Sequence, residues 1–130
     1  MQERQTKQKQ IIYEGLQSLN HPTATEVYAW VHEHYPTVSR ATVFRVLGGF
    51  ASSKQALELR FAGNEVRYDY NTHEHYHARC VCCGKVADVN APLNRAVEVA
   101  GVEACDDFLL DGCVVEFFGR CRECRGENMA

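Results

Sequence analysis

Apolar residues in the first third of the chain recur at the spacing of helical turns. The first predicted helix covers residues 7–19, with apolar positions at i, i+4 and i+7. The second begins at Thr23 with a capping box and stops before Pro36, and the third begins at Ser39, a favourable N-cap. The apolar stripes of these helices are Ile12, Leu16 and Leu19; Ala24, Val27, Tyr28, Val31 and Tyr35; and Val43, Val46, Leu47 and Phe50.

Apolar and polar residues then alternate in two short runs, 56–61 and 65–70, on either side of Gly63–Asn64. Period-two alternation around such a turn predicts a β-hairpin. Three helices followed by a hairpin is the element order of a winged helix. The remaining segment, 73–124, predicts a second subdomain that is mostly β. Its elements are strands over 77–81, 86–90 and 113–118 and a helix over 92–100.

The third predicted helix has a polar side that could contact DNA. Opposite the apolar stripe lie Ala41, Arg45 and Gly48, flanked by Phe44 and Gly49, and acidic residues are few. The third helix of a winged fold enters the major groove of DNA. An ordinary solvated helix face has the same composition, so this feature leaves both interpretations open.

The composition is that of a small soluble globular protein. Of 130 residues, 45% are hydrophobic and 24% charged, which argues against long disorder. This length fits one domain or two very small ones, each near the lower limit for an independent core, so a staple or a partner subunit is expected. The chain has no apolar run of membrane length, and its polar start lacks a secretory signal. These features predict the cytoplasm and no membrane partner.

The net charge of −3 is unevenly divided along the chain. Residues 1–65 carry seven Lys and Arg against six acids, and residues 66–130 carry seven against eleven. Proteins that bind nucleic acid usually present a clear basic excess. The excess in the first half is slight, so charge alone does not establish DNA binding.

Two Cys-x-x-Cys turns are the strongest chemical signal in the sequence. They contain Cys80 and Cys83, and Cys121 and Cys124. In a reducing compartment such pairs indicate metal ligands, and two pairs supply the four thiolates of a closed tetrahedral zinc site. With all four positions filled, this zinc is expected to hold the fold and not to catalyse. Disulfides and a redox dithiol are the alternatives. The other cysteines, expected to be packed or idle thiols, are Cys82, Cys105 and Cys113.

Histidines and aspartates form a second candidate site. His75 and His77 are separated by one residue, so on a strand both side chains point to the same face. Asp69 and Asp88 lie a few residues to either side. Imidazole and carboxylate donors suit Fe(II), Mn(II) or Zn(II), and spacing does not choose among them. Surface residues without a metal are the alternative.

Four segments of the sequence carry a family resemblance. They are Ser39–Leu47 (SRATVFRVL), Arg67–Tyr70 (RYDY), His75–Lys85 (HYHARCVCCGK) and Cys121–Cys124. Together they resemble the ferric uptake regulator (Fur) family, most closely its peroxide-stress repressors, and the likeness runs from about residue 6 to residue 124. The resemblance implies a winged helix joined to a small α/β dimerisation domain, and homodimers that bind palindromic promoter DNA.

The resemblance also implies a regulatory metal held by three histidines and two aspartates, which map onto His21, Asp69, His75, His77 and Asp88. His21 comes from the resemblance alone, because sequence spacing does not connect it to the others. Asp69 points to the peroxide-sensing branch, since iron and zinc sensors of the family usually carry glutamate there. In that branch bound Fe(II) leads to oxidation of His21 or His75 and loss of DNA, whereas Mn(II) reacts poorly with peroxide.

The chain departs from the family pattern in its first and third helices. Compared with the family, the sequence includes little of the helix that usually precedes residues 6–9, so DNA contacts and domain packing from that region are expected to differ. Phe44 replaces the usual tyrosine and loses a hydroxyl that could reach DNA. Gly48 and Gly49 stand where better helix formers are usual, so the third helix is expected to end near Leu47.

The sequence therefore predicts an α+β fold. A winged helix-turn-helix DNA-binding domain over residues 1–70 precedes a small α/β, zinc-stapled dimerisation domain over 71–130. We expect a metal-dependent, peroxide-sensing repressor with structural Zn(II) and regulatory Fe(II) or Mn(II). One alternative is a metal-occupancy sensor without oxidation. Another is a small non-haem iron enzyme using His75, His77 and Asp69, which leaves the winged-helix pattern unexplained. The residues expected to contact DNA are Lys7, Lys9, Arg40, Ala41, Thr42, Phe44 and Arg45.

Overall fold

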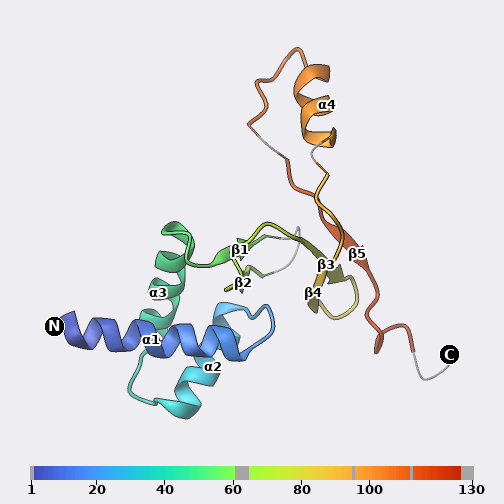
Figure 1. Cartoon of the computed structure of the whole chain (residues 1–130). Coiled ribbons are helices and arrows are strands. Elements are labelled where there is room, and N and C mark those ends of the chain that lie inside the picture. The colour runs from blue at the N-terminus through green and yellow to red at the C-terminus, as the bar shows by residue number, and fades with distance from the viewer. Residues whose placement is uncertain (1, 61–64, 95, 112, 127–130) are drawn as a thin grey trace. The chain divides into compact units, whose positions relative to one another are not determined.

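The computed structural model describes residues 2–60, 65–94, 96–111 and 113–126, and the chain forms two compact units that divide between His73 and Glu74. The first unit contains α1, α2, α3, β1 and β2, and the second contains β3, β4, α4 and β5 (Figure 1). Each unit has its own small sheet. Among the described residues, none of the helices has the length and apolarity that crossing a bilayer requires.

Three helices make up most of the first unit: α1 (Gln2–Ser18), α2 (Ala24–His34) and α3 (Arg40–Ser52). The predicted caps are present at the starts of α2 and α3. Thr23 Oγ1 accepts the backbone N–H of Glu26, and the Glu26 carboxylate accepts the backbone N–H of Thr23. Ser39 Oγ accepts the backbone N–H of Thr42. These side chains satisfy N–H groups that have no partner within the helix, which is why the helices begin there.

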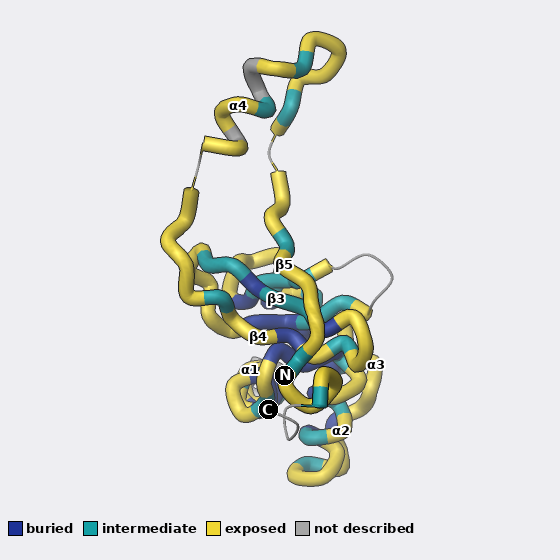
Figure 2. The backbone as a smooth tube through the Cα atoms, turned by 90° about the vertical axis from the view of Figure 1, so that its right-hand side faces the viewer, coloured by how far each residue is buried: buried dark blue, intermediate teal, exposed yellow. Residues whose placement is uncertain are grey.

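The apolar stripes of the three helices meet in one core. Figure 2 shows buried segments, in dark blue, along these helices. Tyr13 lies edge-on against Phe50 at the border of this core, with 5.6 Å between the ring centroids. The buried residues of the core are Ile11, Ile12, Leu16, Val27, Val31, Val38, Val43, Val46, Leu47, Phe50, Ala56 and Tyr68. The helical periodicity in the sequence therefore predicted the core of this unit.

Two helices of the first unit differ from their predicted ends. α1 begins at Gln2 instead of residue 7, because Gln, Glu and Arg are good helix formers even where no apolar stripe is present. The prediction that α3 ends near Leu47 is wrong, since the helix continues through Gly48 and Gly49 to Ser52. Phe50 is only 6% exposed, and its burial in the core holds the last turn in spite of the two glycines.

The helices are followed by two short antiparallel strands, β1 (Leu57–Leu59) and β2 (Arg67–Asp69). Leu57 pairs with Asp69, and Leu59 pairs with Arg67. Both strands are shorter than the predicted runs, and the predicted turn at Gly63–Asn64 lies outside the described residues. Three helices and this antiparallel pair have the predicted order of a winged helix.

The second unit is built on a three-stranded sheet in the order β4–β3–β5. Its strands are β3 (Tyr76–Cys80), β4 (Val86–Val89) and β5 (Phe117–Gly119). β4 runs antiparallel to β3, whereas β5 runs parallel to it. The last strand is shorter than the predicted 113–118, because its pairing with β3 is limited to Phe117–Gly119.

Between β4 and β5 the chain forms α4 (Ala96–Ala104). The prediction placed the start of this helix at Pro92. In the structure the Asn94 side chain accepts the backbone N–H of Ala96, and the backbone N–H of Asn94 donates to the Tyr76 hydroxyl. Asn94 is a favourable residue just before a helix, and it replaces the proline as the starting signal.

Little apolar surface is buried in the second unit. Among its described residues, the buried apolar ones are Cys80 and Val86. Figure 2 shows α4 and the chain that follows mostly in yellow, as exposed. The large apolar side chains exposed in this unit are Val81, Leu93, Val97, Val99, Phe108, Leu109, Val114, Val115, Phe117 and Phe118. Soluble monomers rarely expose so much apolar surface together.

Candidate metal centres

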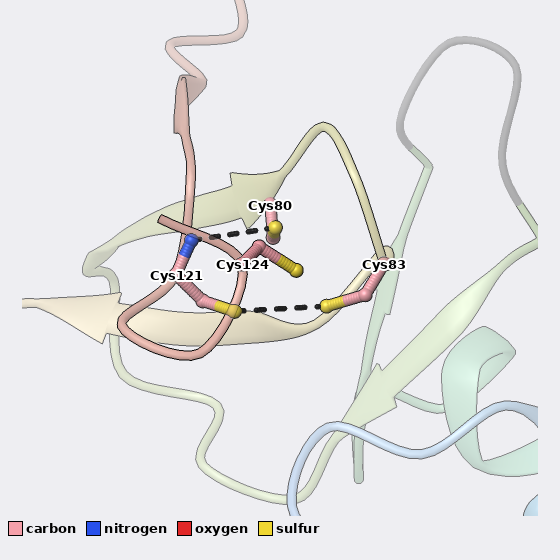
Figure 3. A group of neighbouring side chains, drawn as sticks. All are labelled: Cys80, Cys83, Cys121 and Cys124. Atoms are coloured by element: carbon pink, nitrogen blue, oxygen red, sulfur yellow. Dashed lines mark hydrogen bonds between the residues drawn. The ribbon is translucent and has the colours of Figure 1, made fainter. Parts of the chain in front are cut away.

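Four thiols gather in the second unit, where their side chains point toward one another (Figure 3). Cys80 ends β3, Cys83 lies in the turn that leads to β4, and Cys121 and Cys124 lie in the turn after β5. All four Sγ atoms lie within 4.8 Å of one another. The parallel pairing of β3 with β5 brings the two turns side by side. Gly84, with φ 80°, allows the tight backbone that follows the first turn.

The sulfur positions fit a tetrahedral ion. The Sγ atoms of Cys83 and Cys121 are 3.8 Å apart. Zinc–sulfur bonds of about 2.3 Å give a tetrahedron with edges of about 3.8 Å. The backbone N–H of Cys121 also donates to Cys80 Sγ at 3.3 Å, the kind of hydrogen bond that orients a metal-binding thiolate.

The charges in this cluster favour a cation. The hydrogen bond from the Cys121 backbone, helped by that of Cys83, lowers the pKa of the Cys80 thiol to about 5. Contact with the Cys121 thiol raises the pKa of Cys124. Sulfurs this close cannot all ionise alone, whereas a divalent cation stabilises four thiolates together. The donor set therefore fits zinc, and all seven cysteines are free thiols.

In the first unit, His21 faces Asp69. His21 Nε2 lies 3.3 Å from Asp69 Oδ2, and each side chain is 7% exposed. Asp69 ends β2, and His21 lies in the loop before α2. Two hydrogen bonds fasten this loop to β2. Arg67 Nη1 donates to the carbonyl of His21 at 2.9 Å, and the backbone N–H of Tyr68 donates to the carbonyl of Pro22 at 2.8 Å.

Neighbouring asparagines orient both of these donors. His21 Nδ1 lies 2.7 Å from Asn20 Oδ1, which can only accept, so in a neutral imidazole the ring proton belongs on Nδ1 and the lone pair on Nε2. Asp69 Oδ1 accepts the backbone N–H of Asn71 at 2.9 Å, which leaves Oδ2 directed at the imidazole. A lone pair and a carboxylate oxygen then face each other, an arrangement that needs a proton or a metal cation between them.

In the second unit, two imidazoles converge on one carboxylate. His77 on β3 stands directly opposite Asp88 on β4, and its Nε2 lies 3.5 Å from Asp88 Oδ1. His75 places its own Nε2 3.1 Å from the same oxygen. The two ring centroids are 4.2 Å apart. The Asp88 side chain is 45% exposed, so an ion could reach this group from solvent.

The donors that the sequence singled out thus form two groups, one in each unit. His21 and Asp69 belong to the first unit, and His75, His77 and Asp88 belong to the second. The orienting roles of Asn20 and Asn71 were not predicted. The available signal was that each asparagine stands within two residues of a predicted donor.

The residues predicted to contact DNA lie at the surface of the first unit. α3 buries one side in the core and leaves the opposite side in solvent. Thr42 is half-buried on this helix. The exposed residues among the predicted DNA contacts are Lys7 and Lys9 on α1 and Arg40, Ala41, Phe44 and Arg45 on α3.

A winged helix joined to a unit with thiol and imidazole clusters defines a class of protein, the metal-responsive DNA-binding regulators. Residues 1–107 match the sequence profile of the Ferric uptake regulator family. The Peroxide-responsive repressor PerR of Staphylococcus epidermidis is 36% identical over 124 residues, which cover 95% of this chain and 82% of the relative. The chain belongs to the ferric uptake regulator family, and it is a transcriptional regulator, not an enzyme.

Solved structures agree with this assignment at the level of the fold. The peroxide stress regulator of Campylobacter jejuni has a TM-score of 0.67 and 24% identity, with 93% of this chain and 91% of that chain covered. The Helicobacter pylori ferric uptake regulator, which has three functional metal binding sites, has a TM-score of 0.73 and 23% identity, with 92% and 80% covered. The predicted α+β fold, a winged helix followed by a small α/β domain, is confirmed.

Proposed function

We propose that the chain is a cytoplasmic, homodimeric repressor that binds palindromic promoter DNA with a regulatory metal and releases it after reaction with peroxide. The observation that carries the proposal is the orientation of the two donor groups. Within the first unit His21 Nε2 and Asp69 Oδ2 face each other, and within the second His75 and His77 face Asp88. All five side chains would hold one Fe(II) or Mn(II), since both ions accept imidazole and carboxylate donors.

Five donors divided between two units would couple metal binding to DNA binding. The first unit carries α3, and α3 is the helix proposed to enter the major groove. In a dimer, two such helices must reach half-sites about 34 Å apart, or a multiple of that distance. Metal held by donors from both units would fix each winged helix to its own dimerisation domain, and so fix the spacing of the recognition helices.

Zinc at the four thiols is proposed as the structural metal. Cys80, Cys83, Cys121 and Cys124 fill a tetrahedral shell, which leaves no position for substrate. The two turns follow β3 and β5, so zinc bound by both would join the ends of these strands and hold the sheet of a unit that buries little apolar surface.

Dimerisation is supported by the exposed apolar surface of the second unit. Phe108, Leu109 and Val114 have exposed fractions of 69%, 90% and 87%. A patch of this kind marks a protein–protein interface in soluble proteins. The occupant proposed is a second copy of the chain, since palindromic DNA requires two-fold symmetry in the protein that binds it.

Peroxide sensing is supported by the Staphylococcus epidermidis relative, a peroxide-responsive repressor at 36% identity, and by aspartate at residue 69. When bound, Fe(II) supplies the electron that cleaves peroxide, and Mn(II) does so poorly. The resemblance to the peroxide-sensing branch implies that His21 and His75 would be the imidazoles oxidised. An oxidised imidazole is a weaker donor, so its loss would release the metal and then the DNA.

The test measures DNA binding by Fe(II)-loaded and Mn(II)-loaded protein before and after a small excess of peroxide, together with mass spectrometry of peptides that contain His21 and His75. We expect peroxide to abolish binding by the Fe(II) form, with one added oxygen on either histidine, and to leave the Mn(II) form bound and unmodified. If the Fe(II) form keeps its DNA and both histidines, the chain is a metal-occupancy sensor without an oxidation step.

A further inference from the structure

The first turn of α3 carries an arginine whose guanidinium lies over two aromatic rings. Arg40 Cζ lies 4.6 Å from the centroid of the Phe44 ring, one turn further along the same helix. It lies 5.9 Å from the centroid of Tyr28 on α2. One Nη atom is also 3.5 Å from Thr25 Oγ1. Contacts from two helices therefore restrain the plane of the guanidinium group.

Arg40 is not placed to stabilise its own helix. Cations are unfavourable at a helix N-terminus, where the backbone N–H groups already give a partial positive charge. The first turn of α3 contains no acidic residue that would offset this charge. Within the described part of the chain, the guanidinium contacts Phe44, Tyr28 and Thr25, and none of these is negative. The positive charge remains available to an anionic or electron-rich partner.

The position of Arg40 on α3 identifies that partner as DNA. Arg40, Ala41, Phe44 and Arg45 lie on the exposed side of the helix, opposite the side that is buried in the core. N-terminal residues of a recognition helix are the ones that contact base edges in the major groove. Arg40 is the first residue of α3, so it lies at the end that enters the groove.

We propose that Arg40 reads a guanine in each operator half-site and that Phe44 is the positioning residue that holds its guanidinium. The inference rests on the proposed function, because α3 must enter the groove. A guanidinium donates two parallel N–H bonds to O6 and N7 of guanine, and it does so through the edge of its plane. Phe44 lies against the guanidinium and takes none of its N–H groups, so the edge of the group keeps its capacity to donate. Phenylalanine gives up the hydroxyl of the usual tyrosine but keeps the ring that Arg40 needs.

The experiment begins with an operator selected by the Mn(II)-loaded protein from a pool of duplexes with a randomised palindrome. Dissociation constants are then measured by fluorescence anisotropy, at three salt concentrations. The duplexes are the selected operator and versions with one base pair changed symmetrically in both half-sites. The variants are Arg40→Lys, Arg40→Ala, Phe44→Leu and Phe44→Tyr. Lys54→Gln, which removes an exposed charge just beyond α3, is the matched control.

We expect the wild type to prefer guanine at one half-site position by about 10-fold or more, the discrimination typical of a bidentate contact. Arg40→Lys keeps the charge and loses the planar fork, so it should lose this preference while keeping the salt dependence. Phe44→Leu should lose much of the preference, and Phe44→Tyr should keep it. Lys54→Gln should bind with wild-type specificity. Circular dichroism of each variant establishes that its helices are intact.

A phosphate contact gives a different result. Arg40→Ala would then weaken binding to all duplexes alike and reduce the salt slope by about one, and Arg40→Lys would restore both. Either that result or full discrimination by folded Phe44→Leu overturns the inference and leaves the repressor function standing. If the wild type selects no operator, the proposed function fails and the inference fails with it.

Discussion

The two units of the chain hold their structures by different means. Among the described residues, the first unit buries twelve apolar side chains in one core, whereas the buried apolar residues of the second are Cys80 and Val86. Burial contributes about 25 cal/mol per Å² of apolar surface, so the first unit has the larger share of this stabilisation. In place of a large core, the second unit has a cluster of four thiols and an exposed apolar surface. Removing a metal should therefore affect the two units unequally.

The largest expected effect is that of Cys121→Ser. The substitution removes one of four zinc ligands, and structural zinc contributes folding free energy directly, so the second unit should lose zinc, unfold and stop dimerising. The helices of the first unit should remain protected. Zinc content by mass spectrometry, sedimentation and hydrogen exchange of peptides from each unit would measure these effects. Cys82→Ser, at an exposed cysteine outside the cluster, is the control. A stable zinc-free dimer from Cys121→Ser would contradict the zinc assignment.

His77→Ala should have the next largest effect. It removes a donor from the second unit but leaves the thiol cluster and the core of the first unit intact. Loss of a residue that hydrogen-bonds to a metal ligand typically lowers metal affinity by roughly 10- to 100-fold. His77 is proposed as a ligand itself, so we expect affinity for Mn(II) to fall by more than this. Metal-dependent DNA binding should be lost, while zinc content and dimerisation persist. His73→Ala, in the same segment but outside the donor group, should behave as wild type in metal titrations and DNA-binding assays.

Asp69→Glu should reduce the reaction with peroxide and leave metal-dependent DNA binding intact. The variant keeps the charge and moves the carboxylate outward by one methylene, which alters how a metal facing His21 is held. We expect repression with Mn(II) or Fe(II) to persist and most of the peroxide response to disappear. The readouts are DNA binding after peroxide and oxygen incorporation at His21 and His75. A variant that still oxidises and dissociates like wild type would show that the length of this side chain does not tune the reaction.

The smallest effects concern two glycines in the helices of the first unit. Gly49 lies inside α3, and a Cβ there would meet nothing within 4 Å, so Gly49→Ala should stabilise the unit by up to about 1 kcal/mol. A Cβ on Gly15 would lie 2.7 Å from Trp30 Cε3, so Gly15→Ala should destabilise it by about 1–3 kcal/mol. Chemical unfolding followed by helical circular dichroism measures both. Equal effects of the two substitutions would contradict the packing of α1 against α2.

Local signals predicted most of the fold. The capping box at Thr23 and the cap at Ser39 started two helices where expected, because each depends on side chains within three residues of the backbone that they bind. The end of α3 could not be predicted in this way. Its last turn is held by burial of Phe50 in the core, and propensity at Gly48 and Gly49 gives no information about that burial.

The two kinds of candidate site also differed in how far the sequence predicted them, because one depends on local spacing and the other on contacts between distant residues. Each Cys-x-x-Cys turn by itself places two thiols close together. The pairing of β3 with β5 is then enough to bring the two pairs of thiols into one cluster. His21 is different, because it reaches Asp69 through hydrogen bonds that fasten its loop to β2, and those bonds join residues 46 positions apart. Family resemblance supplied His21, and no local pattern would have replaced it. Asn20, which orients the ring, follows only once that loop is known.

The parallel pairing of β5 with β3 also determines where the chain can accept inserted residues. The contact between Cys83 and Cys121 closes a loop of 38 residues, which includes α4. The entropic cost of closing a flexible loop grows only with the logarithm of its length, and each doubling adds about 0.6 kcal/mol. Residues can therefore be inserted between β4 and β5 at small cost to the thiol cluster. A peptide tag or fluorescent reporter placed there would test the tolerance of this loop, and it would leave the ends of both strands unchanged.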